Sequence, residues 1–177
     1  MPTTPARHPK PWLGWFGATW GVGGVLFLLG YAIWRLAPLA AEALRGPLGG
    51  LQWAVLVAFV LFMAYSEGYR GFQRAFSPRV AARARNLRDA PTLPRVVLAP
   101  LFCMAYFAAP RRRRIAAYAV TLGVVLLVIL VQRLEQPWRG IVDAGVVLGL
   151  GWGFVATLVY AVRAMRGDAM PVPAEVV

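Results

Sequence analysis

Hydrophobic residues gather in four long segments of this chain, separated by short stretches that contain charges, proline and glycine. A helix needs about 20 mostly apolar residues to cross a hydrocarbon core about 30 Å thick. In lipid, the backbone polar groups must be paired inside the segment itself, which favours helices. We therefore predict an all-α, polytopic transmembrane helical bundle. Its four spanning helices are predicted at 13–36, 47–66, 115–132 and 141–162.

A fifth apolar stretch, residues 96–109, contains Pro100 and is short for a span. Segments of this length are more often re-entrant or interfacial. Arg95 precedes it and the run 111–114 follows it, and the positive-inside rule disfavours arginine clusters on opposite faces of a membrane. We predict that the stretch re-enters or lies at the surface. A five-span arrangement, with one terminus outside, is the alternative.

Charge predicts the orientation, because cytoplasmic loops carry an excess of Lys and Arg. The arginine-rich segment 67–95 and the run 111–114 are placed in the cytoplasm, together with the tails 1–12 and 163–177. The first apolar segment exceeds the core of about 7 to 15 residues found in signal peptides, so we expect it to be retained. Of the nineteen basic residues only Lys10 is a lysine, a bias typical of GC-rich genomes. We expect a bacterial inner membrane.

The composition restricts the chemistry that this chain can perform. The only histidine is His8, the only cysteine is Cys103, and the serines are Ser66 and Ser77. Zinc, copper and haem sites need several converging ligands, and a Ser-His-acid triad would have to recruit His8. With Lys10 as the sole lysine there is no phosphate-binding Gly-Lys loop. We expect no metal and no cofactor, and favour a protein that is not an enzyme.

The richest polar run is 64–78, at the predicted cytoplasmic end of the second span. If the α-helix continues through it, Glu67 and Arg70 are neighbours at i and i+3. Four aromatic residues then form one stripe: Tyr65, Tyr69, Phe72 and Phe76. We interpret this as an interfacial aromatic belt with an intrahelical ion pair. The alternative is a polar site for a lipid headgroup or a partner protein.

A helix-start signal, Ser77-Pro78, follows this run. Beyond it, apolar residues recur at spacings of four and three between arginines, which predicts a basic amphipathic helix lying in the interface. Arginines there and in the run 111–114 suit anionic headgroups or an acidic partner. Nucleic acid is disfavoured, because the basic segment lacks an independent soluble fold. The candidate site residues are Glu67, Tyr69, Arg70, Arg74, Arg79, Arg83, Arg111, Arg112, Arg113 and Arg114.

Glycines recur at helical spacing in two of the spans. The fourth span has Gly145, Gly149 and Gly153, and the first has Gly14, Gly17, Gly21 and Gly24. Small residues in such rows let membrane helices approach closely. We expect packing inside one bundle, with the first span against the fourth; contact with another subunit is the alternative. Gly17, Gly21, Gly145, Gly149 and Gly153 are the predicted helix-packing positions.

Asp143 is the only carboxylate inside a predicted span. Its place near a helix amino terminus, where negative charge is favoured, indicates a cap. A carboxylate in a membrane is also a candidate functional group, for example in a proton or cation pathway.

Three classes of function fit these observations. The preferred one is a small non-enzymatic accessory, assembly or scaffolding subunit, which packs through its glycine rows and binds anionic lipid or an acidic partner with its arginine-rich face. The second is an oligomeric transporter or channel subunit that uses Asp143, Glu67 and residues 96–109. The third is a lipid-phosphate enzyme with arginines as phosphate clamps and Glu67 as a base. The expected partners are anionic lipids and either another membrane protein or further copies of this chain.

Overall fold

The structure is a computed structural model that describes residues 11–177. The first ten residues, with His8, Lys10 and most of the predicted amino-terminal tail, lie outside the described part. All regular secondary structure between residues 11 and 177 is helical. The helices are α1 (Pro11–Arg45), α2 (Gly50–Met63), η1 (Ala64–Phe76), α3 (Ser77–Asp89), α4 (Leu93–Val97), α5 (Ala99–Cys103), α6 (Arg111–Val131) and α7 (Trp138–Arg166).

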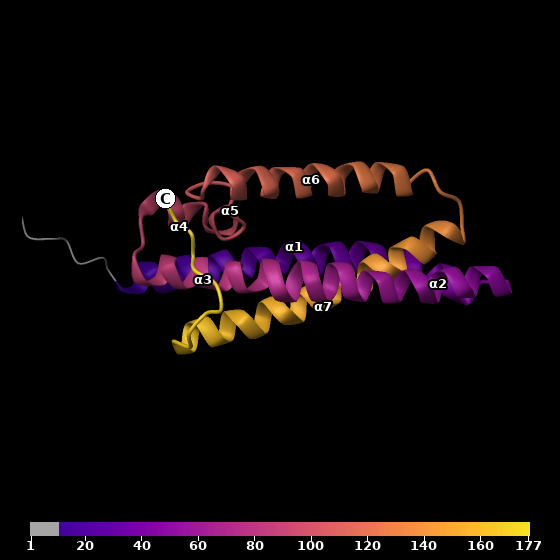
Figure 1. Cartoon of the computed structure of the whole chain (residues 1–177), viewed down its shortest axis with the longest axis horizontal. Coiled ribbons are helices and arrows are strands. Elements are labelled where there is room, and N and C mark those ends of the chain that lie inside the picture. The colour runs from indigo at the N-terminus through magenta and orange to yellow at the C-terminus, as the bar shows by residue number, and fades with distance from the viewer. Residues whose placement is uncertain (1–10) are drawn as a thin grey trace, which may run out of the picture.

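Four helices are long and apolar enough to cross a membrane: α1, the unbroken helix Gly50–Asp89, α6 and α7. This confirms the predicted fold class, and the chain is an integral membrane protein. The four helices run side by side along one axis (Figure 1). At 1.5 Å per residue α6 is about 31 Å long, which matches the hydrocarbon core. The other three are longer and extend past it.

The second spanning helix is much longer than predicted. It continues through the polar run without a break, because α2, the π-helical η1 and α3 form one helix to Asp89. Ser77 and Pro78 therefore do not start a new helix; the backbone N–H of Ser77 bonds to the carbonyl of Phe72. The wider π-helical turn accommodates Pro78, whose nitrogen has no hydrogen to donate.

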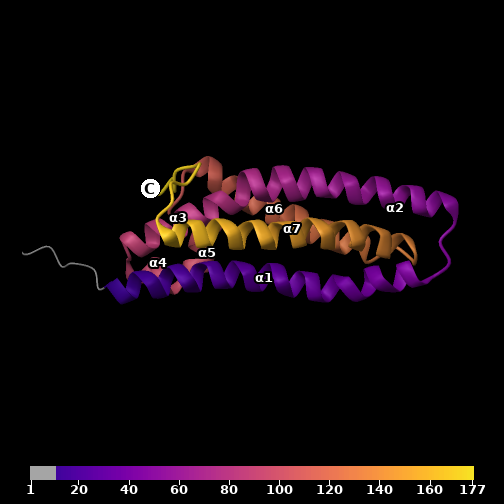
Figure 2. The same cartoon turned by 90° about the horizontal axis from the view of Figure 1, so that it is seen from below.

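α3 is amphipathic, as the arginine spacing predicted, but it does not lie flat in the interface. It extends the second spanning helix along the bundle axis (Figure 2). Its apolar residues Val80, Ala84 and Leu87 are buried against α1, α5 and α7. The interfacial placement was wrong because the apolar side of α3 faces protein instead of lipid.

Residues 96–109 do not cross the bundle. They fold into the last two residues of α4, all of α5 and a loop, and Val96, Ala99, Phe102 and Cys103 join the buried cluster with residues of α1 and α3. α4, α5, the far end of α3 and the carboxyl terminus lie at the same end of the molecule (Figures 1 and 2). This segment is therefore a compact cap on one end of the bundle, and the five-span alternative is wrong.

The two glycine rows face different helices. In α7, a Cβ at Gly145 or Gly153 would lie 2.5 Å from the ring of Phe59 or Phe72, both in the second helix. In α1, a Cβ at Gly17 would meet Val96 and Leu87, and one at Gly21 would meet Cys103. α1 and α7 do pack together, as expected, but these glycines of the two helices contact other elements and not one another. Both rows are occupied by contacts inside this chain.

α6 is set apart from the other spanning helices. It runs beside the bundle at a distance (Figure 1), and not one of its twenty-one residues is buried. Tyr106 of the preceding loop contacts the first half of α6: its hydroxyl is hydrogen bonded to that of Thr121, and its ring meets that of Tyr118 edge to face. α6 therefore packs only loosely against the side of the bundle that it faces.

Candidate functional site

A cavity of about 200 Å³ lies between α6 and the rest of the bundle. Apolar residues of α1, α6 and α7 form most of its wall. Its polar groups are Glu67, Gln132, Arg139 and Asp143. With two carboxylates against one guanidinium, we call it the acidic cavity.

Glu67 lies deep in the molecule instead of at headgroup level. It lines the acidic cavity together with Val124 of α6, which is about 20 Å from the start of that helix and about 10 Å from its end. A Cβ at Gly149 of α7 would lie 2.7 Å from a carboxylate oxygen of Glu67. Asp143 is therefore not the only carboxylate inside a span; the prediction failed because the polar run was taken as the end of the second helix.

Asp143 does not cap α7. The helix begins at Trp138, so Asp143 lies in the second turn, and the backbone N–H of Gly140 in the first turn donates instead to Oε1 of Gln136 at 3.2 Å. The carboxylate is 4% exposed and its Oδ2 lies 3.8 Å from Nε of Arg139. Neither of these two atoms has a hydrogen-bond partner. Two buried polar atoms thus remain unsatisfied at the wall of the acidic cavity.

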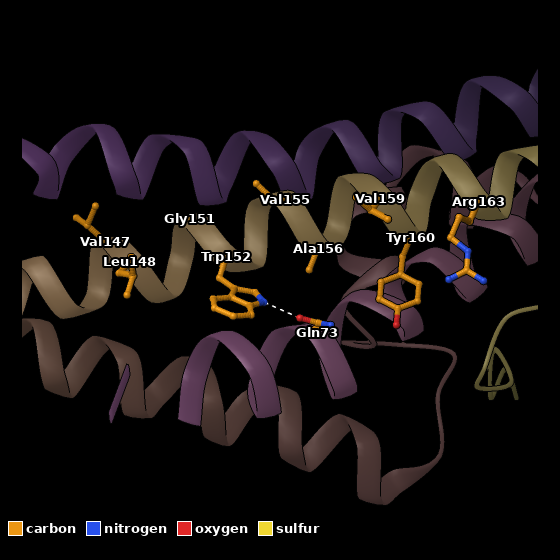
Figure 3. A pocket seen from close by; sticks show the side chains of 10 residues that line it. All are labelled: Gln73, Val147, Leu148, Gly151, Trp152, Val155, Ala156, Val159, Tyr160 and Arg163. Carbon is orange, nitrogen blue, oxygen red and sulfur yellow. Dashed lines mark hydrogen bonds between the residues drawn. The ribbon is translucent and has the colours of Figure 1, made fainter. Parts of the chain in front are cut away.

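Two polar contacts fix the register between the second helix and α7. The indole Nε1 of Trp152 donates a hydrogen bond to Oε1 of Gln73 at 2.7 Å (Figure 3). One turn further, the hydroxyls of Ser77 and Thr157 are hydrogen bonded at 2.9 Å, and both side chains are buried. Polar residues within a spanning helix are therefore satisfied here by α7.

The predicted ion pair between Glu67 and Arg70 is not formed within the described structure, where neither residue takes part in a salt bridge. The π-helical winding changes the angle between neighbouring side chains, and Glu67 turns toward α7. The predicted aromatic stripe becomes two pairs. Tyr65 stacks on Tyr69 at 6.1 Å, and Phe72 meets Phe76 edge to face at 5.5 Å.

Arg83 is not available to headgroups, because its side chain is buried at 2% exposure. Its guanidinium donates five hydrogen bonds to backbone carbonyls and stacks on the ring of Phe102 with Cζ 4.2 Å from the centroid. The acceptors, at 2.6 to 3.2 Å, are Phe102, Phe107, Ala108, Ala174 and Glu175. Arg83 thus joins α3, the loop after α5 and the carboxyl-terminal tail.

The other candidate arginines divide into two groups. Arg79 and Arg113 are partly buried and line one small hollow with Arg83 and Glu175. The exposed ones are Arg70, Arg74, Arg111, Arg112 and Arg114. Glu67 is remote from the cluster at the start of α6, because Arg114 precedes Val124 by ten residues, about 15 Å along the helix. Of the arginine clamps expected of a lipid-phosphate enzyme, the run 111–114 is therefore not brought to the acid, whereas Arg70 and Arg74 lie on the same helix as Glu67.

The tail contact predicts a pH response. Nε of Arg113 lies 2.5 Å from Glu175, and this hydrogen bond holds the pKa of Glu175 below its usual 4.5. Because the pKa of Glu175 is lowered in the folded chain, its contact with Arg113 stabilises the fold above about pH 4.5. This stabilisation is lost as the pH falls further. A spin label on Val177→Cys should therefore gain mobility as the pH falls below about 4.5. The same label in Glu175→Gln should show no such transition; a transition there would assign it to another group.

Family models, curated proteins and solved structures were compared with this chain, and none matches. The arrangement of Glu67, Asp143 and Arg139 therefore has to be interpreted from its own chemistry.

Proposed function

We propose that this chain is a small non-enzymatic membrane subunit that assembles with a partner protein along α6. The observation that supports it best is the isolation of α6, which is mostly apolar after its four arginines and yet buries none of its residues. Membrane helices associate through close packing and interhelical hydrogen bonds. Most of α6 makes no close packing contacts with the rest of this chain. Its surface is therefore available to pack against a second protein and to form hydrogen bonds with it.

The acidic cavity supplies the chemistry that selects the partner. The charge of Arg139 offsets that of Asp143, whereas Glu67 faces the cavity and forms no salt bridge with any residue of 11–177. Polar groups at this depth are costly unless they are paired. The proposed partner is therefore a transmembrane helix that carries a basic or amide side chain. This side chain would lie beside Glu67 in the acidic cavity.

Native mass spectrometry after gentle transfer from the source membrane into nanodiscs tests this proposal. We expect a foreign membrane protein at fixed stoichiometry, retained by wild type and reduced in Glu67→Gln, which keeps the size of the side chain and removes the charge. Glu42→Gln, an exposed carboxylate outside the cavity, is the matched control. A chain that is recovered only as a monomer or as copies of itself contradicts the proposal.

A second candidate, an oligomeric transporter or channel subunit, is supported by one observation. Glu67 and Asp143 line the same cavity inside the bundle, and intramembrane carboxylates often mark ion or proton pathways. Ion flux in liposomes that is lost in Asp143→Asn, with no foreign protein in the preparation, would favour this function over the subunit.

The exposed arginines support the expectation of a cytoplasmic face that binds anionic lipid or an acidic partner. Several of them lie with the cap formed by α4 and α5 at one end of the molecule. Four are exposed on helices at that end: Arg111, Arg112, Arg114 and Arg166. By the positive-inside rule this end is cytoplasmic, in a bacterial inner membrane, and the carboxyl terminus lies there as well.

Cysteine labelling tests this orientation. Thr92→Cys and Arg112→Cys lie at the cap end, and Glu135→Cys lies in the loop at the opposite end. In intact cells an impermeant maleimide should label only position 135. The unaltered chain is the blank, because Cys103 is buried and burial raises the pKa of its thiol to about 12. Labelling at positions 92 and 112 but not at 135 would show that the orientation is the opposite of the proposed one.

A further inference from the structure

A second hollow, the α7 groove, follows one side of α7 from Val147 to Arg163 and has a volume of about 680 Å³. Its lining is mostly apolar. Trp152, Tyr160 and Arg163 project to the same side of the helix (Figure 3). We propose that the α7 groove binds one acyl chain of an anionic phospholipid, whose phosphate pairs with Arg163. This site is separate from the acidic cavity and does not depend on the proposed partner.

The groove has the dimensions of a lipid chain. Val147 and Arg163 are sixteen residues apart, or about 24 Å along the helix. That is longer than one leaflet of the hydrocarbon core, which is about 15 Å, so a chain can lie along it from the headgroup inward. The middle of the groove is open at Gly151, where an added Cβ would meet no atom within 4 Å.

The deep part of the groove suits hydrocarbon. The one indole donor there, Nε1 of Trp152, already bonds to Gln73 at 2.7 Å, so the indole presents an apolar surface. Val155 and Val159 continue this lining toward the end of α7. Gln73 is the one other polar side chain that lines this deep part of the groove, so an acyl chain would be in contact with apolar surface along most of this length.

The mouth of the groove suits an anion. Arg163 is the one basic residue that lines it and lies in the last turn of α7, with its Cζ 5.8 Å from the ring centroid of Tyr160. Tyrosine and arginine at this position are typical of headgroup level. The side chain of Arg163 is half exposed and its Nε lies 3.5 Å from Asp168. Exposed ion pairs of this kind are weak, so a lipid phosphate can compete with Asp168.

Native mass spectrometry with a defined lipid mixture tests the site. The purified chain is placed in nanodiscs of equal phosphatidylglycerol and phosphatidylcholine, and the lipids that stay bound after release are counted. We expect one bound phosphatidylglycerol per chain, preferred over phosphatidylcholine by roughly fivefold, the factor that one arginine near a membrane supplies. Arg163→Gln should lower the preference by about this factor, although the other exposed arginines are unchanged, and Asp168→Asn should increase it.

Gly151→Leu should abolish retention by filling the groove. Gly123→Leu is its matched control, because Gly123 of α6 also has no neighbour within 4 Å and lies outside the groove. Equal retention of the two lipids by wild type, or unchanged retention in Gly151→Leu, would overturn the proposal. If Gly151→Leu fails to fold, as judged by circular dichroism, the preference measured in Arg163→Gln decides.

Discussion

Replacing Arg83 with leucine is expected to lower the free energy of unfolding by about 3 to 5 kcal/mol, because each buried carbonyl left without a partner costs about 1 to 3 kcal/mol. Arg83 satisfies five carbonyls from three separate segments. Removing it takes the donor from the carbonyls of Phe107, Ala174 and Glu175, whereas Phe102 and Ala108 keep backbone donors. The carboxyl-terminal tail is then detached from α3. Reversible unfolding in mixed detergent micelles measures the loss.

The controls separate this role from a general effect of charge. Arg166→Leu removes an exposed arginine at the same end of the molecule and should change stability by less than about 0.5 kcal/mol. Arg83→Lys keeps the charge but offers a single nitrogen as donor. Its free energy of unfolding should therefore lie between those of Arg83→Leu and Arg166→Leu. An Arg83→Leu protein as stable as Arg166→Leu would show that the carbonyl network does not hold this end together.

Gly149→Leu is expected to destabilise the bundle by about 3 kcal/mol, the upper range for overpacking a filled contact. A Cβ at Gly149 would lie 2.7 Å from Oε2 and 3.1 Å from Cδ of Glu67. The larger side chain must push η1 away from α7, which also strains the contact between Trp152 and Gln73. The same unfolding measurement detects it.

A double-mutant cycle makes this prediction specific. Glu67→Ala removes the atoms that collide with the new side chain, so it should restore part of the stability lost in Gly149→Leu, and residues in contact typically couple by about 0.5 to 3 kcal/mol. Gly123→Leu, placed in open space on α6, should be close to neutral. Strict additivity of Gly149→Leu and Glu67→Ala would contradict the packing of Glu67 on Gly149.

The four apolar segments could be predicted because hydropathy over about 20 residues is a direct consequence of the lipid environment. The residues at which the helices end could not be predicted in this way. The second helix was predicted to stop near Ser66, where polar residues begin, but it continues to Asp89. Gln73 and Ser77 are tolerated inside it because Trp152 and Thr157 of α7 bond to them. Such pairing across helices leaves no trace in the hydropathy of either helix.

Glycine spacing located close helix contacts but did not identify the helices that make them. Spacing defines a face of a helix, whereas the neighbour of that face depends on the whole bundle. The same limit applies to Arg83, which the sequence does not distinguish from Arg79 or Arg85. Its burial results from carbonyls in the loop after α5 and in the tail, which meet α3 only in the folded chain.

The most direct test of the proposed function is photo-crosslinking from the acidic cavity in the native membrane. A photoreactive residue at Leu127 of α6, which lines the cavity, is compared with one at Val57, an exposed position of α2. We expect position 127 alone to crosslink to a transmembrane helix that contains a basic or amide residue, and this crosslink to disappear in Glu67→Gln. Crosslinks from position 127 only to lipid, or ones unaffected by Glu67→Gln, would contradict a partner bound at this cavity.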